Sequence, residues 1–389
     1  METLILGWYV LVDTGSVLLL TAFASLQFLG TLAAPMFGVL GDRLGGRALL
    51  CAMRAGYVLL AAVLSVLALA GLLTPSAVFV VAAIAGIVRP NDLVMRNALI
   101  GDTIPRDHLM VALGMSRVTM DSARVAGALC GASLSAALGV GPAYLVVTSF
   151  YAVSLALTFG VARVQPVPSP DGSWQSSGRG SLAATVSRAS SWRELLDGLA
   201  HVWTTPTLLA GTCLALLVNL TAYPSTGGLL PYVARSVYHV DANGLGSLAA
   251  SFSFGALLGS IAMVVTGGPR RPERSTIINI VLWYVLLLGF GYARTMGVGV
   301  AMLMVAGLVQ SIAMISMSAT LLRAAGDRFR AWVMGVRTLA VYGLPIGLLA
   351  SGALIERVGF PPTVAISCAI GLFFTSLIGL RWRTHLWHA

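Results

Sequence analysis

The sequence contains no lysine, and only 10% of its 389 residues are charged. A soluble domain carries about 25% charged residues, so this chain has too little polar surface to cover a water-soluble globule. The missing lysine excludes a standard Walker A phosphate-binding loop and lysine Schiff-base chemistry. The four cysteines stand singly in apolar segments, without metal-binding or redox spacing. We therefore expect them to be small buried residues, and we expect no metal site.

Long apolar runs dominate what is present, since hydrophobic residues make up 57% of the chain. A membrane-spanning helix needs roughly 20 apolar residues. The sequence predicts eleven such helices, near residues 15–38, 47–72, 76–97, 109–138, 142–163, 207–233, 243–266, 275–293, 296–322, 331–355 and 361–381. The apolar stretch 3–12 before them predicts a truncated first helix, and the alternative is a short re-entrant or surface segment. The predicted fold class is an all-α polytopic membrane protein.

The 24 basic residues, all of them arginine, predict the orientation of the chain. They crowd into alternate gaps between the apolar runs, including those at 43–47 and 270–274, whereas the opposite gaps hold only Arg235, Arg294 and Arg357. By the positive-inside rule, the arginine-rich gaps and the C-terminus face the cytoplasm. The arginines form no run or stripe, so no nucleic-acid partner is expected.

A linker divides the chain into two predicted halves. Residues 164–206 are rich in proline, serine and glycine, and their last part, SSWRELLDGLAHVW at 190–203, predicts an amphipathic helix on the cytoplasmic membrane surface. The halves, residues 1–163 and 207–389, repeat weakly: AGIVRP at 85–90 aligns with AGLVQS at 306–311, and Arg117 aligns with Arg337. Duplicated helix bundles are the usual architecture of secondary transporters.

The segment GVLGDRLGGR, residues 38–47, resembles the cytoplasmic loop motif G-x-L-x-D-R-x-G-R-R of the major facilitator superfamily. The matching residues are Gly38, Leu40, Asp42, Arg43, Gly45 and Arg47, whereas Gly46 stands where the family has arginine or lysine. Two further segments, ELLDGLAHVWTTPTL at 194–208 and GDTIPRDHLMVALGMSR at 101–117, resemble the enterobactin-exporter and macrolide-efflux branch of that family.

This resemblance implies two pseudo-symmetric six-helix bundles that rock against each other around a central cavity, with the first helix truncated here. It implies that Asp42 pairs with an arginine or a helix N-terminus across the bundle interface and holds one access state. The alternative is that Asp42 and its arginines are only a solvated topology signal. Transport of this kind needs no cofactor and no ATPase.

Two groups of charged residues fall inside predicted helices, where a charge costs at least ~2.5–3.5 kcal/mol. The spacing within each group puts its members on one helix face. They are Arg89, Asp92 and Arg96 in the fourth helix, and Arg117, Asp121 and Arg124 in the fifth, with Arg337 as the repeat counterpart of Arg117. Membrane-buried carboxylates can bind and release protons, so we expect a proton-coupling network here. The alternative is that these groups are structural ion pairs.

Four polar residues in the second half are candidates for the cavity wall: Asn219, Tyr223, Gln310 and Tyr342. For each of them, a helix kink or ordinary packing is the alternative. The sequence thus predicts a monomeric, multi-pass transporter of the bacterial inner membrane that exports an amphipathic small molecule in exchange for protons. The alternatives are an importer or facilitator of a metabolite and a non-transporting scaffold or sensor. No nucleophile or metal motif of a membrane-embedded enzyme occurs.

Overall fold

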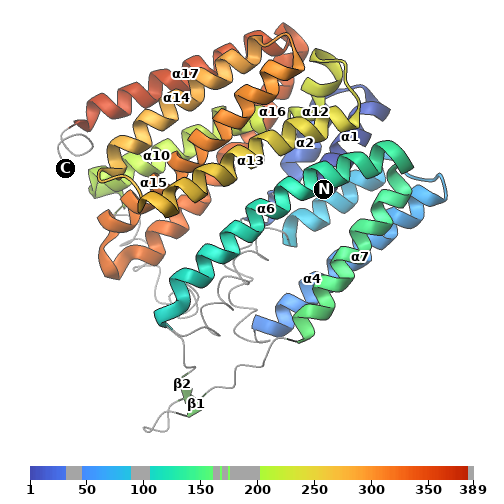
Figure 1. The fold of residues 1–389 in the computed structure, drawn as a ribbon, viewed down its shortest axis with the longest axis horizontal. Coiled ribbons are helices and arrows are strands. Elements are labelled where there is room, and N and C mark those ends of the chain that lie inside the picture. The colour runs from blue at the N-terminus through green and yellow to red at the C-terminus, as the bar shows by residue number, and fades with distance from the viewer. Residues whose placement is uncertain (32–45, 89–105, 161–166, 169–173, 176–201, 384–389) are drawn as a thin grey trace. The chain divides into compact units, whose positions relative to one another are not determined.

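The computed structural model describes residues 1–31, 46–88, 106–160, 167–168, 174–175 and 202–383 (Figure 1). Most of these residues are helical. The described strands, β1 (Val167–Pro168) and β2 (Trp174–Gln175), form a two-residue antiparallel pair. The all-α fold class predicted from the apolar runs is therefore confirmed.

Seven helical segments of the described part are long and apolar enough to cross a membrane. They lie in α4 (Gly46–Leu69), α7 (Val140–Phe159), α13 (Ala242–Thr266), α14 (Pro272–Tyr292), α15 (Met296–Leu339), α16 (Gly343–Val358) with the turn before it, and α17 (Phe360–Arg381). Shorter apolar helices are α2 (Val17–Leu26), the helix Pro75–Val88, and α10 (Pro206–Thr221). Together with α6 (Arg106–Leu138), these elements account for the predicted spans wherever the structure describes them.

The chain forms two compact units. The first unit comprises residues 1–26, 118–140 and 198–389, and the second comprises residues 27–117 and 141–197. The division into bundles at the 164–206 linker stays a prediction.

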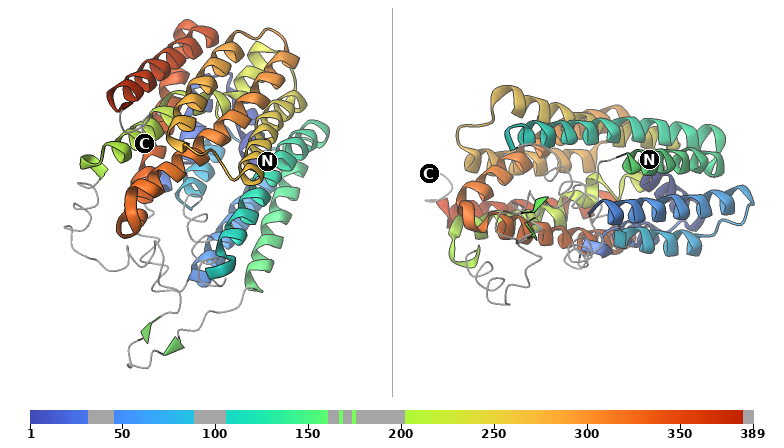
Figure 2. Two further views of the ribbon diagram at one scale, coloured as in Figure 1. Left: turned by 60° about the vertical axis from the view of Figure 1, so that its left-hand side comes forward. Right: turned by 90° about the horizontal axis from the view of Figure 1, so that it is seen from below.

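The first unit is built around α15, which packs along α13 on one side and α14 on the other (Figure 2). Glycines make these close approaches possible. A side chain at Gly255 or Gly259 of α13 would run into the backbone of Met304 or Leu308 in α15. The large side chains of Trp283, Tyr284 and Phe290 fill the core of this unit.

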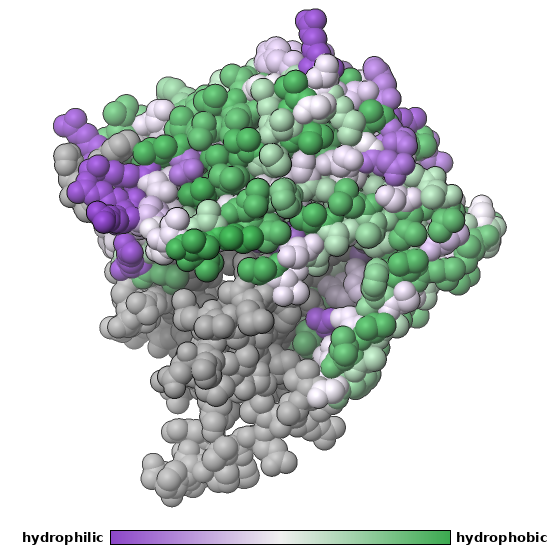
Figure 3. All heavy atoms as spheres, viewed as in Figure 1, coloured by the Kyte–Doolittle hydropathy of each residue, from purple (hydrophilic) through white to green (hydrophobic). Residues whose placement is uncertain are grey.

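The surface of the first unit is apolar where a membrane would contact it. Large side chains such as Val264, Val265 and Leu380 are mostly exposed. In Figure 3, hydrophobic residues cover the middle of the visible face of this unit, and hydrophilic residues gather toward its ends. Such a continuous apolar surface suits lipid and not water.

The second unit contains α4, the helix Pro75–Val88, the first part of α6, and most of α7. Tyr57 of α4 stacks on Tyr151 of α7, with ring centroids 5.4 Å apart. Gly141, at the start of α7, lies against Leu69 at the end of α4. These contacts pair α4 with α7 along their length.

Two predicted spans differ from the observed helices. Residues 296–322 and 331–355 were expected to be separate, but α15 continues from Met296 to Leu339, and the break is the 3-10 turn η3 (Ala340–Tyr342). The segment RAAGDRFRA is polar but contains no proline and mostly good helix formers, so nothing in it ends a helix. The predicted span 207–233 is also interrupted: α10 ends at Thr221, and α11 (Tyr223–Thr226), α12 (Leu230–Tyr232) and the π-helix η2 (Val233–Val237) follow.

Candidate functional site

A buried carboxylate lies in the first unit where three helices meet. Asp121 sits about midway along the 33-residue α6 and is only 1% exposed. Ser260 of α13 and Ser311 of α15 are buried beside it. A charge at this depth of an apolar helix is expensive unless other groups compensate it, and such a residue is a functional candidate by default.

The three side chains form a hydrogen-bonded chain. The Ser260 hydroxyl donates to Asp121 Oδ2 at 3.4 Å, and the Ser260 and Ser311 hydroxyl oxygens are 2.9 Å apart. Because each serine has a single hydroxyl proton, Ser311 donates to Ser260 when Ser260 donates to Asp121. The carboxylate of α6 is thereby linked to α13 and, through it, to α15.

Small residues on α13 allow this meeting of helices. Gly246 lies against Ala128 and Ala132 of α6, where a side chain would collide. Further along α13, Gly259 precedes Ser260 and packs against the backbone of Leu308. α6 and α15 therefore both approach α13 closely, and Ser260 can reach both partners.

Arg124 is the charged neighbour of Asp121. Its guanidinium nitrogen lies 3.6 Å from Asp121 Oδ1, and its side chain is 59% exposed. The predicted spacing of Arg124 and Asp121 on one helix face is therefore found. Since this pair is long and open to one side, it offsets only part of the cost of burying the carboxylate.

A second polar contact starts from Gln310 of α15, the residue before Ser311. Gln310 Nε2 donates to the Tyr223 hydroxyl of α11 at 2.5 Å. The Tyr223 ring meets Trp283 edge to face, with centroids 5.1 Å apart. In the same region the Thr221 and Tyr284 hydroxyl oxygens are 2.6 Å apart. The structure therefore brings together two of the four predicted cavity residues, Tyr223 and Gln310, among aromatic side chains.

The other two cavity candidates lie on flanking elements. The amide of Asn219 donates to the Ala215 carbonyl of its own helix at 2.8 Å. Tyr342 lies in η3, which packs against α10. α10 ends at Thr221, so Asn219 lies in its last turn and Tyr223 follows the break.

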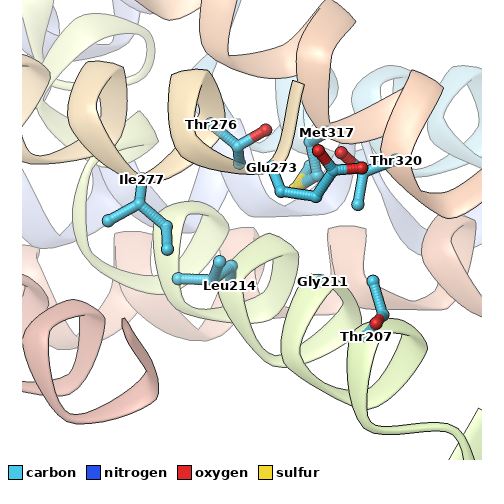
Figure 4. A pocket seen from close by; sticks show the side chains of 8 residues that line it. All are labelled: Thr207, Gly211, Leu214, Glu273, Thr276, Ile277, Met317 and Thr320. Atoms are coloured by element: carbon cyan, nitrogen blue, oxygen red, sulfur yellow. The ribbon is translucent and has the colours of Figure 1, made fainter. Parts of the chain in front are cut away.

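A small cavity lies between the starts of α10 and α14 and the middle of α15 (Figure 4). Glu273 extends over it from the first turn of α14, and Thr207, Thr276 and Thr320 contribute hydroxyls. Two helix N-termini meet here, so the carboxylate of Glu273 complements their positive ends. The cavity is about the size of one water molecule, too small for an organic substrate. Within the described part of the chain, no cluster of potential metal ligands occurs.

Several predicted site residues fall outside the described residues: Gly38, Asp42, Arg43, Gly45, Arg89, Asp92 and Arg96. Arg47 and Arg117 lie in α4 and α6, but their side chains are outside the described part. Arg337 lies half-buried in the last turn of α15.

Ser260 and Ser311 were not predicted from the sequence. Serines are common in apolar helices, and neither is near Asp121 along the chain, so no local pattern singles them out. The only sequence signal is GALLGS at 255–260, where two glycines at small-xxx-small spacing indicate close helix packing beside a serine.

Residues 3–348 of the sequence match the Major Facilitator Superfamily. The chain belongs to this family. It is therefore a multi-pass membrane transporter and not an enzyme, as the sequence predicted. No curated protein matches the chain.

Solved structures of transporters share the fold along nearly the whole chain. The human organic anion transporter MFSD10 (TETRAN) has a TM-score of 0.63 and 18% identity, covering 93% of this chain and 83% of that one. The nucleoside transporter NupG has a TM-score of 0.65 and 14% identity, covering 98% and 93%. The transporter FucP, in its outward conformation, has a TM-score of 0.55 and 16% identity, covering 97% of both chains. At these identities the likeness shows the fold alone.

Proposed function

We propose that this transporter exports an amphipathic small molecule in exchange for protons, and that Asp121 is a proton-coupling residue. The observation that carries the proposal is the burial of Asp121 among Ser260, Ser311 and Arg124. A carboxylate has two protonation states with different partners, so it can bias the packing of the helices around it.

The two states of Asp121 would interact differently with its neighbours. The ionised carboxylate accepts the Ser260 hydroxyl and attracts Arg124, whereas the protonated form loses the attraction to Arg124 and accepts a weaker hydrogen bond. A ligand shifts a conformational equilibrium only by its differential affinity for the two conformations. In this proposal the proton is that ligand. Its binding to Asp121 shifts the equilibrium between conformations that differ in the contact between α6 and α13.

Contact of an amphipathic substrate with Tyr223 and Gln310 is part of the same proposal. Ligand sites are mostly apolar, with a few polar groups that orient the ligand. The Tyr223–Gln310 pair offers such polar groups beside aromatic rings.

The proposed export direction rests on the likeness of residues 101–117 and 194–208 to the efflux branch. The bacterial inner membrane, a cytoplasmic linker and C-terminus, a gating role for the 38–47 loop and a monomeric state belong to the same proposal.

The test is accumulation of ethidium and of a macrolide in an efflux-deficient bacterium, with and without a protonophore. Wild type, Asp121→Asn and Asp241→Asn are compared with the empty vector. Asp241 is an exposed helix cap outside the site, and asparagine retains the capping oxygen, so this variant controls for the loss of a carboxylate.

The proposal predicts lower accumulation in wild type and in Asp241→Asn. In Asp121→Asn, and in every variant after protonophore is added, it predicts the same accumulation of the probes as with the empty vector. Protonophore-sensitive uptake of the probes would instead indicate an importer. Protonophore-sensitive export that persists in Asp121→Asn, with equal protein in the membrane, would remove Asp121 from the coupling.

A further inference from the structure

The hairpin of the first two helices exposes two helix ends at its turn. α1 (Glu2–Thr14) ends in Gly15, whose positive φ of 66° suits glycine, and α2 begins at Val17. The turn therefore presents carbonyl groups from the end of α1 and amide groups from the start of α2. The groups at a helix end carry its partial charge, and side chains of other elements can bind them.

Glu356 binds the positive end of α2. Its Oε1 accepts the Leu18 backbone amide at 3.3 Å and the Ser16 hydroxyl at 3.2 Å. Glu356 belongs to the last turn of α16, where the dipole of its own helix disfavours a negative charge. The placement of this carboxylate is therefore explained by α2 and not by α16.

Arg235 binds the negative end of α1. Its guanidinium donates to the Leu11 carbonyl at 2.5 Å, and the Gly15 amide donates to the same oxygen at 3.0 Å. Arg235 lies in the π-helix η2, and π-helical turns are frequently found at functional sites. The two ends of one hairpin are thus held by opposite charges from two different elements.

The packing beneath these contacts is close at small residues of α2 and α16. Gly352 of α16 lies against Thr21 of α2, where a Cβ would collide with the threonine. Ser25 of α2 donates to the Pro345 carbonyl at 3.2 Å. Figure 1 shows α2 beside α16 and α1 beside α12. Thr21 and Ser25 therefore mark the part of α2 that lies directly against α16.

We propose that Arg235 and Glu356 form a clasp that holds the α1–α2 hairpin against η2 and α16 in one access state of the transporter. Glu356 is exposed and Arg235 half-buried, so each contact is weak enough to break during a transport cycle. The side of the membrane on which the clasp lies rests on the proposed function, since the gaps that hold Arg235 and Arg357 are the arginine-poor ones. The clasp therefore closes the seam between α2 and α16 on the non-cytoplasmic side.

The test is the rate at which a membrane-impermeant maleimide labels a cysteine at position 21. Thr21 is completely buried in the α2–α16 seam, so Thr21→Cys reacts only when the seam opens. The full-length chain is used with Cys51, Cys130, Cys213 and Cys368 replaced by serine or alanine. Labelling is compared for reagent applied to intact cells and to inside-out vesicles.

Glu356→Gln should raise the labelling rate about threefold, and Arg235→Gln about tenfold, because the half-buried contact contributes more. Arg235→Lys keeps the positive charge, so its labelling rate should lie close to the starting rate and well below that of Arg235→Gln. Arg357→Gln, in the same turn as Glu356, is the matched control and should label at the starting rate. Ser16→Ala removes one donor to Glu356 without altering α16, and tests the clasp if Glu356→Gln does not fold.

Equal labelling in every variant would overturn the clasp, and so would an equal rise in all of them, including Arg357→Gln. A specific rise seen only in inside-out vesicles would support the clasp but refute the proposed sidedness. The assay adds no substrate, and it measures cysteine labelling and not transport or proton movement. Failure of the proposed proton coupling therefore leaves its outcome unchanged.

Discussion

Substituting Ser260 by alanine should weaken the contact between α6 and α13 by an amount that depends on the charge of Asp121. Hydrogen bonds to charged groups contribute about 1.5–3 kcal/mol, whereas interhelical hydrogen bonds in membranes average about 0.6 kcal/mol. The Ser260–Asp121 distance of 3.4 Å is long, so the lower end of the first range applies. We expect a coupling energy of about 1.5 kcal/mol when Asp121 is ionised and about 0.6 kcal/mol when it is protonated.

The assay is a double-mutant cycle on the free energy of unfolding, using Ser260→Ala and Asp121→Asn in mixed micelles. Ser311→Ala is the matched control, since its hydroxyl contacts Ser260 and is one step removed from Asp121. Its coupling to Asp121→Asn should be smaller. A coupling energy between Ser260 and Asp121 below about 0.3 kcal/mol would mean that the hydrogen bond does not form, and would refute the reasoning.

Three further substitutions have predicted effects on stability, two in the first unit and one in the second. Gly255→Leu should destabilise the protein by at least about 1–3 kcal/mol, because its side chain would meet the backbone of Met304, and loss of monodisperse protein in detergent measures this. Gly56→Ala, which has open space, should be neutral or slightly stabilising. Asp241→Ala should cost about 1 kcal/mol of unfolding free energy, since the Asp241 side chain accepts the Gly244 amide at 3.0 Å and caps α13. That hydrogen bond holds the pKa of the Asp241 carboxyl below its ordinary value. The unfolding free energy lost in Asp241→Ala should therefore be constant above about pH 4 and shrink only at lower pH.

The spanning helices were largely predictable because hydrophobic length is a local property of the sequence. The prediction was wrong where a polar segment contained no helix-breaking residue, so that α15 continues from Met296 to Leu339. A gap in hydrophobicity marks the edge of a membrane, and it does not require the helix to end. The break after Thr221 was predictable because Pro224 follows it.

Only the part of the candidate site that lies on α6 was predictable from the sequence. The spacing of Asp121 and Arg124 puts them on one face, and the structure brings them together. Ser260 and Ser311 come from distant positions, and only the packing of α13 with α6 and α15 reveals them. Asn219 donates to the Ala215 carbonyl of its own helix, and its place in the cavity wall stays a prediction.

The most direct test of the central claim is proton movement in proteoliposomes that contain the purified transporter and an internal pH-sensitive dye. Adding ethidium outside vesicles of wild-type protein should change the internal pH, and Asp121→Asn should abolish the change while Asp241→Asn retains it. An equal pH response in Asp121→Asn would contradict the assignment of Asp121 as the proton-coupling residue.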